Sequence, residues 1–134
     1  MRTNTAGKYP GNTKRRRAEE AGRRAEDFCA WVLRLKGYRI VAKRSRQPGG
    51  EIDLIAQRGG VLVFIEVKAR ANTRDAMEAI SKRQQSRIIR AAESFVANNA
   101  HFAGLADLTL RFDVMLVAPR RWPVHIPNAW HILA

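Results

Sequence analysis

Two carboxylates and a lysine lie on two short apolar runs that a glycine pair separates. Asp53 belongs to the first run, and Glu66 and Lys68 belong to the second. The pair Gly59-Gly60 suits a two-residue turn, because glycine adopts the positive φ angles that type I′ and II′ turns need. The pattern therefore predicts a β-hairpin that carries the three charged side chains.

A turn at this glycine pair also predicts which residues face each other. Counting outward from Arg58 and Val61 places Asp53 opposite Glu66. The same count places Glu51 opposite Lys68, and because strand side chains alternate in direction, all four charged groups share one face. We expect the opposite face to be core, made of Ile52, Leu54, Ala56, Val63, Ile65 and Val67.

Two carboxylates in this position need a cation near them. Directly opposed strand residues have Cβ atoms only about 4.5–5.5 Å apart, where like charges destabilise a sheet. Mg²⁺ is a hard cation that one or two carboxylates hold, while water and phosphate oxygens fill its other positions. We therefore expect Asp53 and Glu66 to bind Mg²⁺ (or Mn²⁺), with Lys68 orienting a water or stabilising charge on a phosphate.

The composition points to a partner of opposite charge. The chain has 134 residues, enough for one domain, and a net charge of +13. The first 48 residues hold 14 Lys and Arg against 4 Asp and Glu. Such a field attracts polyanions, above all nucleic acid.

The cysteine content and the hydropathy pattern bear on the compartment. Cys29 is the only cysteine, which excludes an intrachain disulfide and fits a reducing cytosol. We expect it to be a small buried thiol. No apolar run reaches the length of a membrane span, so we expect a cytoplasmic protein that does not bind membranes.

The first half of the chain is expected to hold a tail, a helix and a short strand. Residues 1–16 are polar and basic, which predicts a disordered tail, and residues 17–134 are expected to form a single domain. Apolar spacing predicts a helix over 17–36 that Gly37 terminates. A strand is expected at 38–42, followed by a flexible connection over 44–50 whose basic side chains stand beside the carboxylates.

The second half is expected to hold a loop, a helix and two strands. Residues 69–74 are predicted to be a mobile loop, and Ser81 begins a capping box ahead of a helix over 82–97. Alternation predicts a strand over 108–117 in which Arg111 and Asp113 form a structural salt bridge or a half-exposed pair. A final edge strand over 124–132 is interrupted by Pro127. His125 has no evident carboxylate partner and is expected to be a packing or surface residue.

Together these blocks resemble a known nuclease family. Asp53, followed thirteen residues later by Glu66 and then by Val67 and Lys68, resembles the D…(D/E)xK signature of the restriction-endonuclease-like superfamily. The first helix with Glu26, the blocks at 50–55 and 63–68, the Ser81/Gln85 helix start and 111–114 resemble the YraN family, which is similar to archaeal Holliday junction resolvases. The resemblance implies an α/β fold, restriction-endonuclease-like, with a central mixed β-sheet of about four to five strands flanked by helices.

The resemblance also implies roles that the pattern alone does not. From the helix pattern, Glu26 is an ordinary solvated glutamate, whereas the family implies a further metal ligand or its support. Gln85 is carried over as a site residue, although the family's Lys-Gln pair is Gln84-Gln85 here. The backbone carbonyl of Val67 is expected to complete the metal site. The implied substrate is double-stranded or branched DNA, and the implied assembly is a homodimer.

Two other functions remain open at this point. A non-catalytic nucleic-acid-binding protein could retain the nuclease fold, and its DNA binding would then be unchanged by Asp53→Ala or Lys68→Ala. A partner-binding domain could instead use the charged face of the hairpin as a structural salt-bridge cluster, and metal would then not stabilise it.

Overall fold

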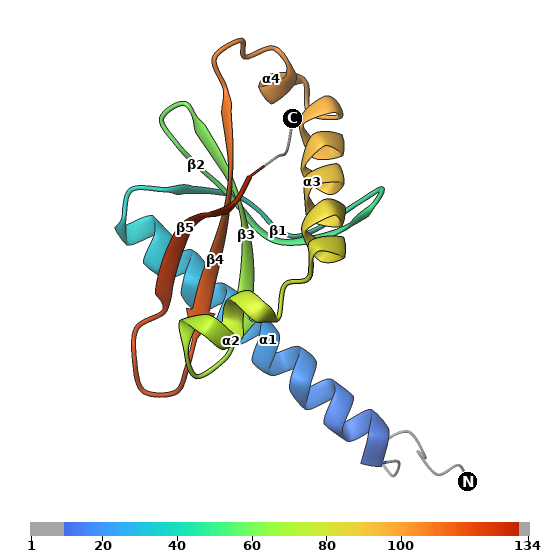
Figure 1. The fold of residues 1–134 in the computed structure, drawn as a ribbon, viewed down its shortest axis with the longest axis vertical. Coiled ribbons are helices and arrows are strands. Elements are labelled where there is room, and N and C mark those ends of the chain that lie inside the picture. The colour runs from blue at the N-terminus through green and yellow to red at the C-terminus, as the bar shows by residue number, and fades with distance from the viewer. Residues whose placement is uncertain (1–9, 132–134) are drawn as a thin grey trace, which may run out of the picture.

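The computed structural model describes residues 10–131, and it has an α/β fold with helices on both faces of a five-stranded mixed sheet (Figure 1). The strands are arranged in the order in which they occur along the chain, and all neighbours are antiparallel except β3 and β4. This agrees with the expected restriction-endonuclease-like arrangement. The elements are α1 (Pro10–Leu35), β1 (Arg39–Gln47), β2 (Gly50–Arg58), β3 (Val61–Ala69), α2 (Thr73–Glu78), α3 (Lys82–Ala97), α4 (Ala100–Ala103), β4 (Thr109–Val117) and β5 (Val124–Trp130).

The predicted hairpin is present with the predicted register. Gly59 has a φ of 58°, a conformation that glycine adopts without strain, and Arg58 pairs with Val61 across the turn. The pairing continues inward as far as Leu54 and Ile65. The turn therefore sets the relative position of the strands that carry Asp53 and Glu66.

Both faces of the sheet are buried, so the expectation of one core face and one chemical face is wrong. Ile55 and Phe64 belong to the face that was expected to be left for chemistry, and both are fully buried. The parallel pair β3–β4 requires a crossover connection, and the helices of that connection cover this face. Ile52 also packs with the α3-side core instead of the α1-side core that holds Leu54 and Ala56.

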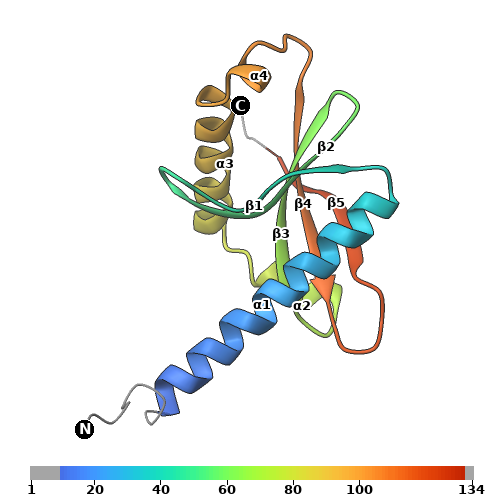
Figure 2. The ribbon, with the colours of Figure 1, turned by 180° about the vertical axis from the view of Figure 1, so that it is seen from behind.

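Helix α1 is longer than expected and projects beyond the sheet (Figures 1 and 2). It begins at Pro10, in the first turn where proline is tolerated, and not at residue 17. Of the expected 1–16 tail, residues 1–9 lie outside the described residues and residues 10–16 are helical. Residues 14–24 are exposed, whereas the following turns pack on the sheet through Cys29 and Leu33, both fully buried.

The C-terminus of α1 is closed as predicted by Gly37. Its φ of 90° allows Tyr38 N–H to donate to Leu33 O (3.0 Å) and Gly37 N–H to donate to Arg34 O (3.0 Å). These two bonds form a Schellman motif, which satisfies carbonyls that the helix end leaves open. The cap turns the chain directly into β1.

Two segments expected to be irregular are regular structure. Strand β1 extends to Gln47 because the polar segment at 43–47 pairs with β2 along the edge of the sheet, where polar side chains can face solvent. The expected loop at 69–74 ends early, since the Asn72 side chain accepts a hydrogen bond from Asp75 N–H (2.9 Å) and caps α2. The helix predicted over 82–97 and the strand predicted over 108–117 are confirmed.

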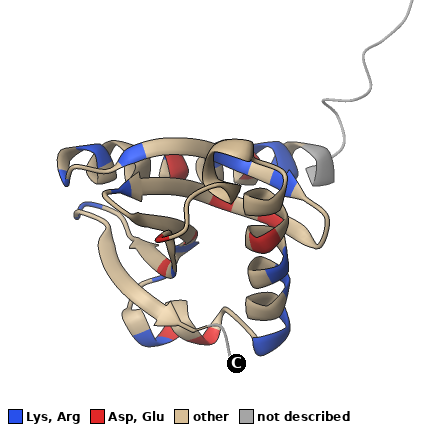
Figure 3. Ribbon diagram, turned by 90° about the horizontal axis from the view of Figure 1, so that it is seen from above, with Lys and Arg blue, Asp and Glu red and all other residues tan. Residues whose placement is uncertain are grey.

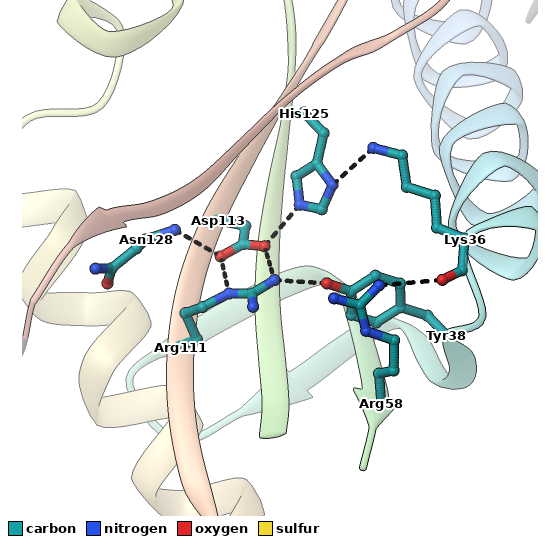
Figure 4. A network of polar contacts seen from close by, with 7 residues as sticks. All are labelled: Lys36, Tyr38, Arg58, Arg111, Asp113, His125 and Asn128. Carbon is teal, nitrogen blue, oxygen red and sulfur yellow. Dashed lines mark hydrogen bonds and ion pairs between the residues drawn. The ribbon is translucent and has the colours of Figure 1, made fainter. Parts of the chain in front are cut away.

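A buried polar network fastens the end of α1 to the other edge of the sheet (Figure 4). Asp113 of β4 is fully buried and accepts hydrogen bonds from Arg111 (2.9 and 2.7 Å) and from Asn128 N–H (2.9 Å). His125 Nε2 lies 2.6 Å from the same carboxylate, so the expectation that this histidine lacks a carboxylate partner is wrong. The partner was missed because it lies on the neighbouring strand.

A contact from Lys36, the residue that follows α1, determines which ring nitrogen of His125 donates to Asp113. The Lys36 ammonium can only donate, and it lies 3.1 Å from Nδ1 of His125. Nδ1 must therefore accept, which leaves the Nε2–H of His125 to donate to Asp113. Burial alone would raise the pKa of Asp113, but the hydrogen bonds from His125, Arg111 and Asn128 outweigh it, and its pKa lies below the ordinary value.

We predict that Asp113→Asn lowers the free energy of unfolding by about 3 kcal/mol, because removing one partner of a buried pair leaves the Arg111 charge without compensation. Urea unfolding at neutral pH measures the change. The control is Glu78→Gln, whose ion pair with Arg74 is 64% exposed on the glutamate side and should cost less than about 0.5 kcal/mol. Equal losses in the two variants would contradict a structural role for the network.

None of the helices in the described part of the chain combines the length and the apolar character that crossing a bilayer requires.

Candidate functional site

The candidate site lies where β2 separates from β3. The pairing of these strands ends at Leu54 and Ile65, whereas β2 stays paired with β1 as far as Gly50. Asp53 comes one residue beyond the last β2–β3 pair, and its Oδ2 accepts a hydrogen bond from the backbone N–H of Val67 (2.9 Å). If the β2–β3 pairing continued, this N–H would donate to a backbone carbonyl of β2. Here it donates to the Asp53 carboxylate instead.

Glu66 is held from two sides at the same fork. Only 6% of the residue is exposed, and its Oε2 accepts a hydrogen bond from Nε2 of Gln84 in the first turn of α3 (2.7 Å). Lys68, on the same strand, places its Nζ 3.3 Å from the same oxygen. The expected neighbour of Lys68 was Glu51, which instead pairs with Arg46 at 3.4 Å. The Lys68 ammonium is therefore not engaged by Glu51 and can contact Glu66 and a ligand bound next to it.

Glu26 reaches the site from α1. Its Oε1 accepts a hydrogen bond from Nη1 of Arg44 at 2.7 Å, and its side chain is 13% exposed. Arg44 has a φ of 50°, which is uncommon for a residue with a side chain. The backbone of β1 is therefore distorted at the residue whose side chain contacts this carboxylate.

Burial makes all three carboxyl groups hard to ionise. Burial raises the pKa of Asp53 to about 7, and the nearby Glu66 charge adds to this effect. Burial also raises the pKa of Glu66, although Lys68 opposes the rise. The pKa of Glu26 is raised by burial, while its hydrogen bond from Arg44 acts in the opposite direction and the Asp53 charge adds to the rise. A bound cation would lower the cost of keeping these groups charged.

The donor atoms fit a hard divalent cation. Among the described residues, neighbouring donors engage Oε1 of Glu26, Oδ2 of Asp53 and Oε2 of Glu66. The carboxyl groups of Asp53 and Glu66 also lie within hydrogen-bond reach of each other. Carboxylate oxygens gathered in this way are the ligand type that Mg²⁺ and Mn²⁺ prefer. No set of three His, Cys, Asp or Glu side chains in the described chain is already gathered closely enough to hold an ion. Side chains would therefore have to move when a cation binds.

The Val67 carbonyl also faces this space. In a strand, the N–H and C=O of one residue point to the same side. Since the N–H of Val67 donates to Asp53, its carbonyl oxygen faces the fork between β2 and β3 as well. This is compatible with the expectation that it completes a set of oxygen ligands.

Basic side chains surround the carboxylates. An open hollow of about 480 Å³ lies between α1 and the β1–β2 hairpin, next to Glu26, and a second of about 420 Å³ lies between that hairpin and α3. Lys and Arg positions are spread over the outer helices and loops, while several acidic positions lie further inward (Figure 3). The hollows are lined by Arg23, Arg44, Arg46 and Arg87 together with Glu19, Gly22, Glu26, Gly50, Glu51, Ser81, Gln84 and Ile88.

Comparison with known families assigns the chain to one of them. Residues 25–117 match the model of the family described as "Uncharacterised protein family UPF0102". The chain belongs to this family, the YraN family. It is 51% identical to a UPF0102 protein of Parvibaculum lavamentivorans over 84% of this chain and 83% of that one. UPF0102 proteins of Chelativorans sp. and Mesorhizobium japonicum are 48% and 46% identical, over 87% and 90% of this chain and 91% and 94% of theirs.

The matched segment of the YraN family contains all the expected site residues. The structure brings Asp53, Glu66 and Lys68 together at the fork, with Glu26 near enough that its charge adds to the raised pKa of Glu66, although burial is the main cause of all three carboxyl shifts. Gln85, by contrast, donates to the carbonyl of Ile80 at 3.4 Å and helps to close the turn before α3.

Gln84 is the residue that sequence reasoning missed. The capping box suggested that its side chain turns back toward Ser81, and half of that motif is present, since the Ser81 hydroxyl accepts from Gln84 N–H at 3.1 Å. The Gln84 side chain points instead to Glu66. The family's Lys-Gln pair was the available signal, but it did not indicate which of two consecutive glutamines faces the carboxylates.

We predict that Asp53→Asn stabilises the metal-free protein at about pH 8 by roughly 1–2 kcal/mol. The pKa of Asp53 in the folded chain, about 7, lies above its ordinary value of 3.8. Between these values the folded state binds more protons than the unfolded state, so the free energy of unfolding falls as pH rises. Asparagine removes this contribution and can still accept the hydrogen bond from Val67.

Urea unfolding with EDTA at about pH 5 and about pH 8 measures both effects. The variant should lose less stability than the wild type between the two pH values. Glu93→Gln, which removes an exposed carboxylate from α3, serves as the control and should change neither quantity. A variant less stable than the wild type at the higher pH would show that the buried charge is well compensated without metal.

Proposed function

We propose that this protein is a metal-dependent endonuclease that hydrolyses DNA phosphodiester bonds with Mg²⁺ or Mn²⁺. The observation that supports this most directly is the pair of buried carboxylates at the β2–β3 fork with Lys68 beside them. Two poorly solvated acids with raised pKa values destabilise the fold in the absence of a cation, which favours a catalytic or binding role over a structural one. The basic surface supplies the affinity for a phosphate backbone.

Each side chain has a distinct role in this proposal. Asp53 and Glu66 would hold the cation through carboxylate oxygens, and Glu26 would be a further ligand in place of its contact with Arg44. A cation held there would supply Lewis-acid chemistry, polarising the scissile phosphate and lowering the pKa of a water. Lys68 orients the attacking water or stabilises the charge that grows on the phosphate. Gln84 holds Glu66 in place, because it donates to the oxygen that faces α3.

The proposed substrate is double-stranded or branched DNA, cut by a homodimer. Basic residues lie on α1, β1 and α3, and no element between residues 10 and 131 carries a base-reading motif such as a zinc finger, so recognition of backbone shape fits better than recognition of sequence. Arg44 and Arg46 lie beside the carboxylates, where they can neutralise phosphates next to the cleaved bond. A two-fold assembly suits cleavage of two symmetric strands.

We predict that Asp53→Ala and Lys68→Ala each lower the rate of DNA cleavage by at least about 100-fold, because each removes a group that stabilises the transition state. Linear, supercoiled and four-way-junction DNA are incubated with purified protein and Mg²⁺, Mn²⁺ or EDTA, and products are separated on gels. EDTA should abolish cleavage. Lys82→Ala removes an exposed lysine at the start of α3 and should retain full activity.

The same assay separates the proposal from its alternative. Cleavage that persists in Asp53→Ala would identify a contaminating nuclease and refute the site. If the wild type cleaves no DNA but binds it equally well with and without Asp53, a non-catalytic nucleic-acid-binding protein is the better description. Such a protein would keep its affinity for DNA in Lys68→Ala as well.

We predict that replacing Arg15, Arg16 and Arg17 by glutamine weakens DNA binding and its salt dependence. Each phosphate contact contributes about 0.9 to the slope of log K against log salt, so losing three contacts would reduce the slope by up to about 3. Fluorescence anisotropy over a salt series measures it. Glu19→Gln with Glu20→Gln changes the same exposed part of α1 and should leave the slope intact. An unchanged slope in the arginine variant would exclude this part of α1 from the DNA interface.

A further inference from the structure

Three exposed aromatic rings stack on one another where α1 meets the β4–β5 connection. Phe28 and Trp31 belong to α1, and Trp122 belongs to the connection. Ring centroids are 6.3 Å apart for Phe28–Trp31, 5.7 Å for Phe28–Trp122 and 5.8 Å for Trp31–Trp122. The side chains are still 37%, 48% and 60% exposed in chain order. Neither core cluster contains them, and the proposed cleavage site does not use them.

The geometry of the cluster leaves ring faces open. In a face-to-face column of three rings, the outer two would be twice as far apart as neighbours. Here the three separations are nearly equal, and the two indole planes are only 8° from parallel. Neighbouring rings therefore overlap only along their edges, which leaves part of each indole face exposed to solvent. A flat aromatic ligand could stack on such a surface.

Positive charge borders the rings. Arg120 and Arg121 line an open hollow of about 520 Å³ together with Phe28 and Trp122. Arg24 precedes Phe28 by four residues, a spacing that places both on one side of α1. The Arg121 side chain also donates to the carbonyl of Ala71, which holds the connection and its tryptophan in place.

The acidic residue nearest to the rings in sequence does not cancel this charge. Asp27 precedes Phe28 on α1 and forms an ion pair with Lys43 at 3.0 Å.

We propose that Phe28, Trp31 and Trp122 form a platform on which the bases of single-stranded DNA stack, with Arg120 contacting the adjoining phosphates. Aromatic side chains beside a cationic surface are the combination that binds unpaired strands without sequence preference, since every base has a π face. The inference rests on the proposed nuclease function, which it deepens by naming an unpaired strand as part of the bound DNA. Binding to the platform can nevertheless be measured without cleavage.

Charge argues against a second copy of the chain as the occupant. A two-fold interface brings the same patch of both subunits together. The patch that holds Arg24, Arg120 and Arg121 would then meet the same positive patch of the partner, and like charges would repel in a partly desolvated interface. A polyanion removes this repulsion, whereas self-association increases it.

The test measures binding of an oligothymidylate of about 12 nucleotides to the full chain in EDTA at fixed salt. The variant is Trp31→Leu with Trp122→Leu, which keeps apolar cover but removes both indoles. We expect its affinity to fall about ten-fold or more, whereas Trp31→Phe with Trp122→Phe should stay within about three-fold of the wild type. Leu35→Ala, an exposed apolar residue of α1 outside the ring cluster, is the matched control and should bind normally.

Tryptophan fluorescence provides a second readout. The chain has 3 tryptophans, and Trp130 is only 6% exposed in the core. Quenching by the oligonucleotide therefore reports on Trp31 and Trp122, and stacking should quench most of the exposed signal. Circular dichroism confirms that the leucine variant is folded.

Each outcome decides the inference. Normal oligothymidylate binding by the folded leucine variant overturns the platform. If the variant also sediments as a monomer where the wild type is a dimer, without loss of DNA affinity, the rings form an interface between two copies of the chain. A specific loss of binding supports the platform even if the wild type cleaves no DNA. Metal-dependent cleavage together with normal single-strand binding by the variant leaves the nuclease function standing and removes the platform.

Discussion

The separation of β2 from β3 is the constraint on which the candidate site depends. If the two strands stayed paired, the Val67 N–H would donate to a backbone carbonyl of β2. The Asp53 carboxylate would then lack the donor that holds it in the fork. Because the pairing stops at Leu54 and Ile65, Asp53 takes over that N–H at 2.9 Å. The strand interruption thus orients a carboxylate and draws it into a poorly solvated space. The raised pKa of Asp53 is the electrostatic consequence.

The layers on either side of the sheet supply the other groups of the site. Helix α1 delivers Glu26 from one face, and its position is set by the glycine cap at Gly37 and by the Lys36–His125–Asp113 contacts (Figure 4). Helix α3 delivers Gln84 from the opposite face. The crossover between the parallel strands β3 and β4 is what places α3 there, so the mixed topology and the composition of the site have the same cause.

The parts of the fold that depend on local chemistry could be predicted from the sequence. The Gly59-Gly60 turn, the Ser81 cap and the alternation over 108–117 each specify structure through neighbouring residues, and all three are present. The features that could not be predicted depend on distant contacts. The outer half of β1 is polar and becomes a strand only because β2 pairs with it.

In the candidate site, too, the residues whose positions depend on local sequence could be predicted, and those that depend on distant contacts could not. Asp53, Glu66 and Lys68 could be located from the hairpin alone, since the turn determines their positions relative to one another. The partners of these groups could not, because Gln84 and Arg44 come from other elements and approach only in the folded chain. The first turns of α1 were missed for a different reason: they have no apolar stripe, which is the usual signal for a helix.

Those first turns make α1 a rigid spacer. Glu26 lies 16 residues after Pro10, which corresponds to about 24 Å along the helix, roughly two-thirds of one turn of B-DNA at about 34 Å. Because one uninterrupted helix carries both Glu26 and the exposed arginines before it, the separation between Glu26 and the start of α1 is fixed by the hydrogen-bonded geometry of the helix. A duplex bound at the fork would then meet positive charge at a set distance along its axis. The fixed length of α1 would therefore set how far from the site the duplex is contacted by arginines.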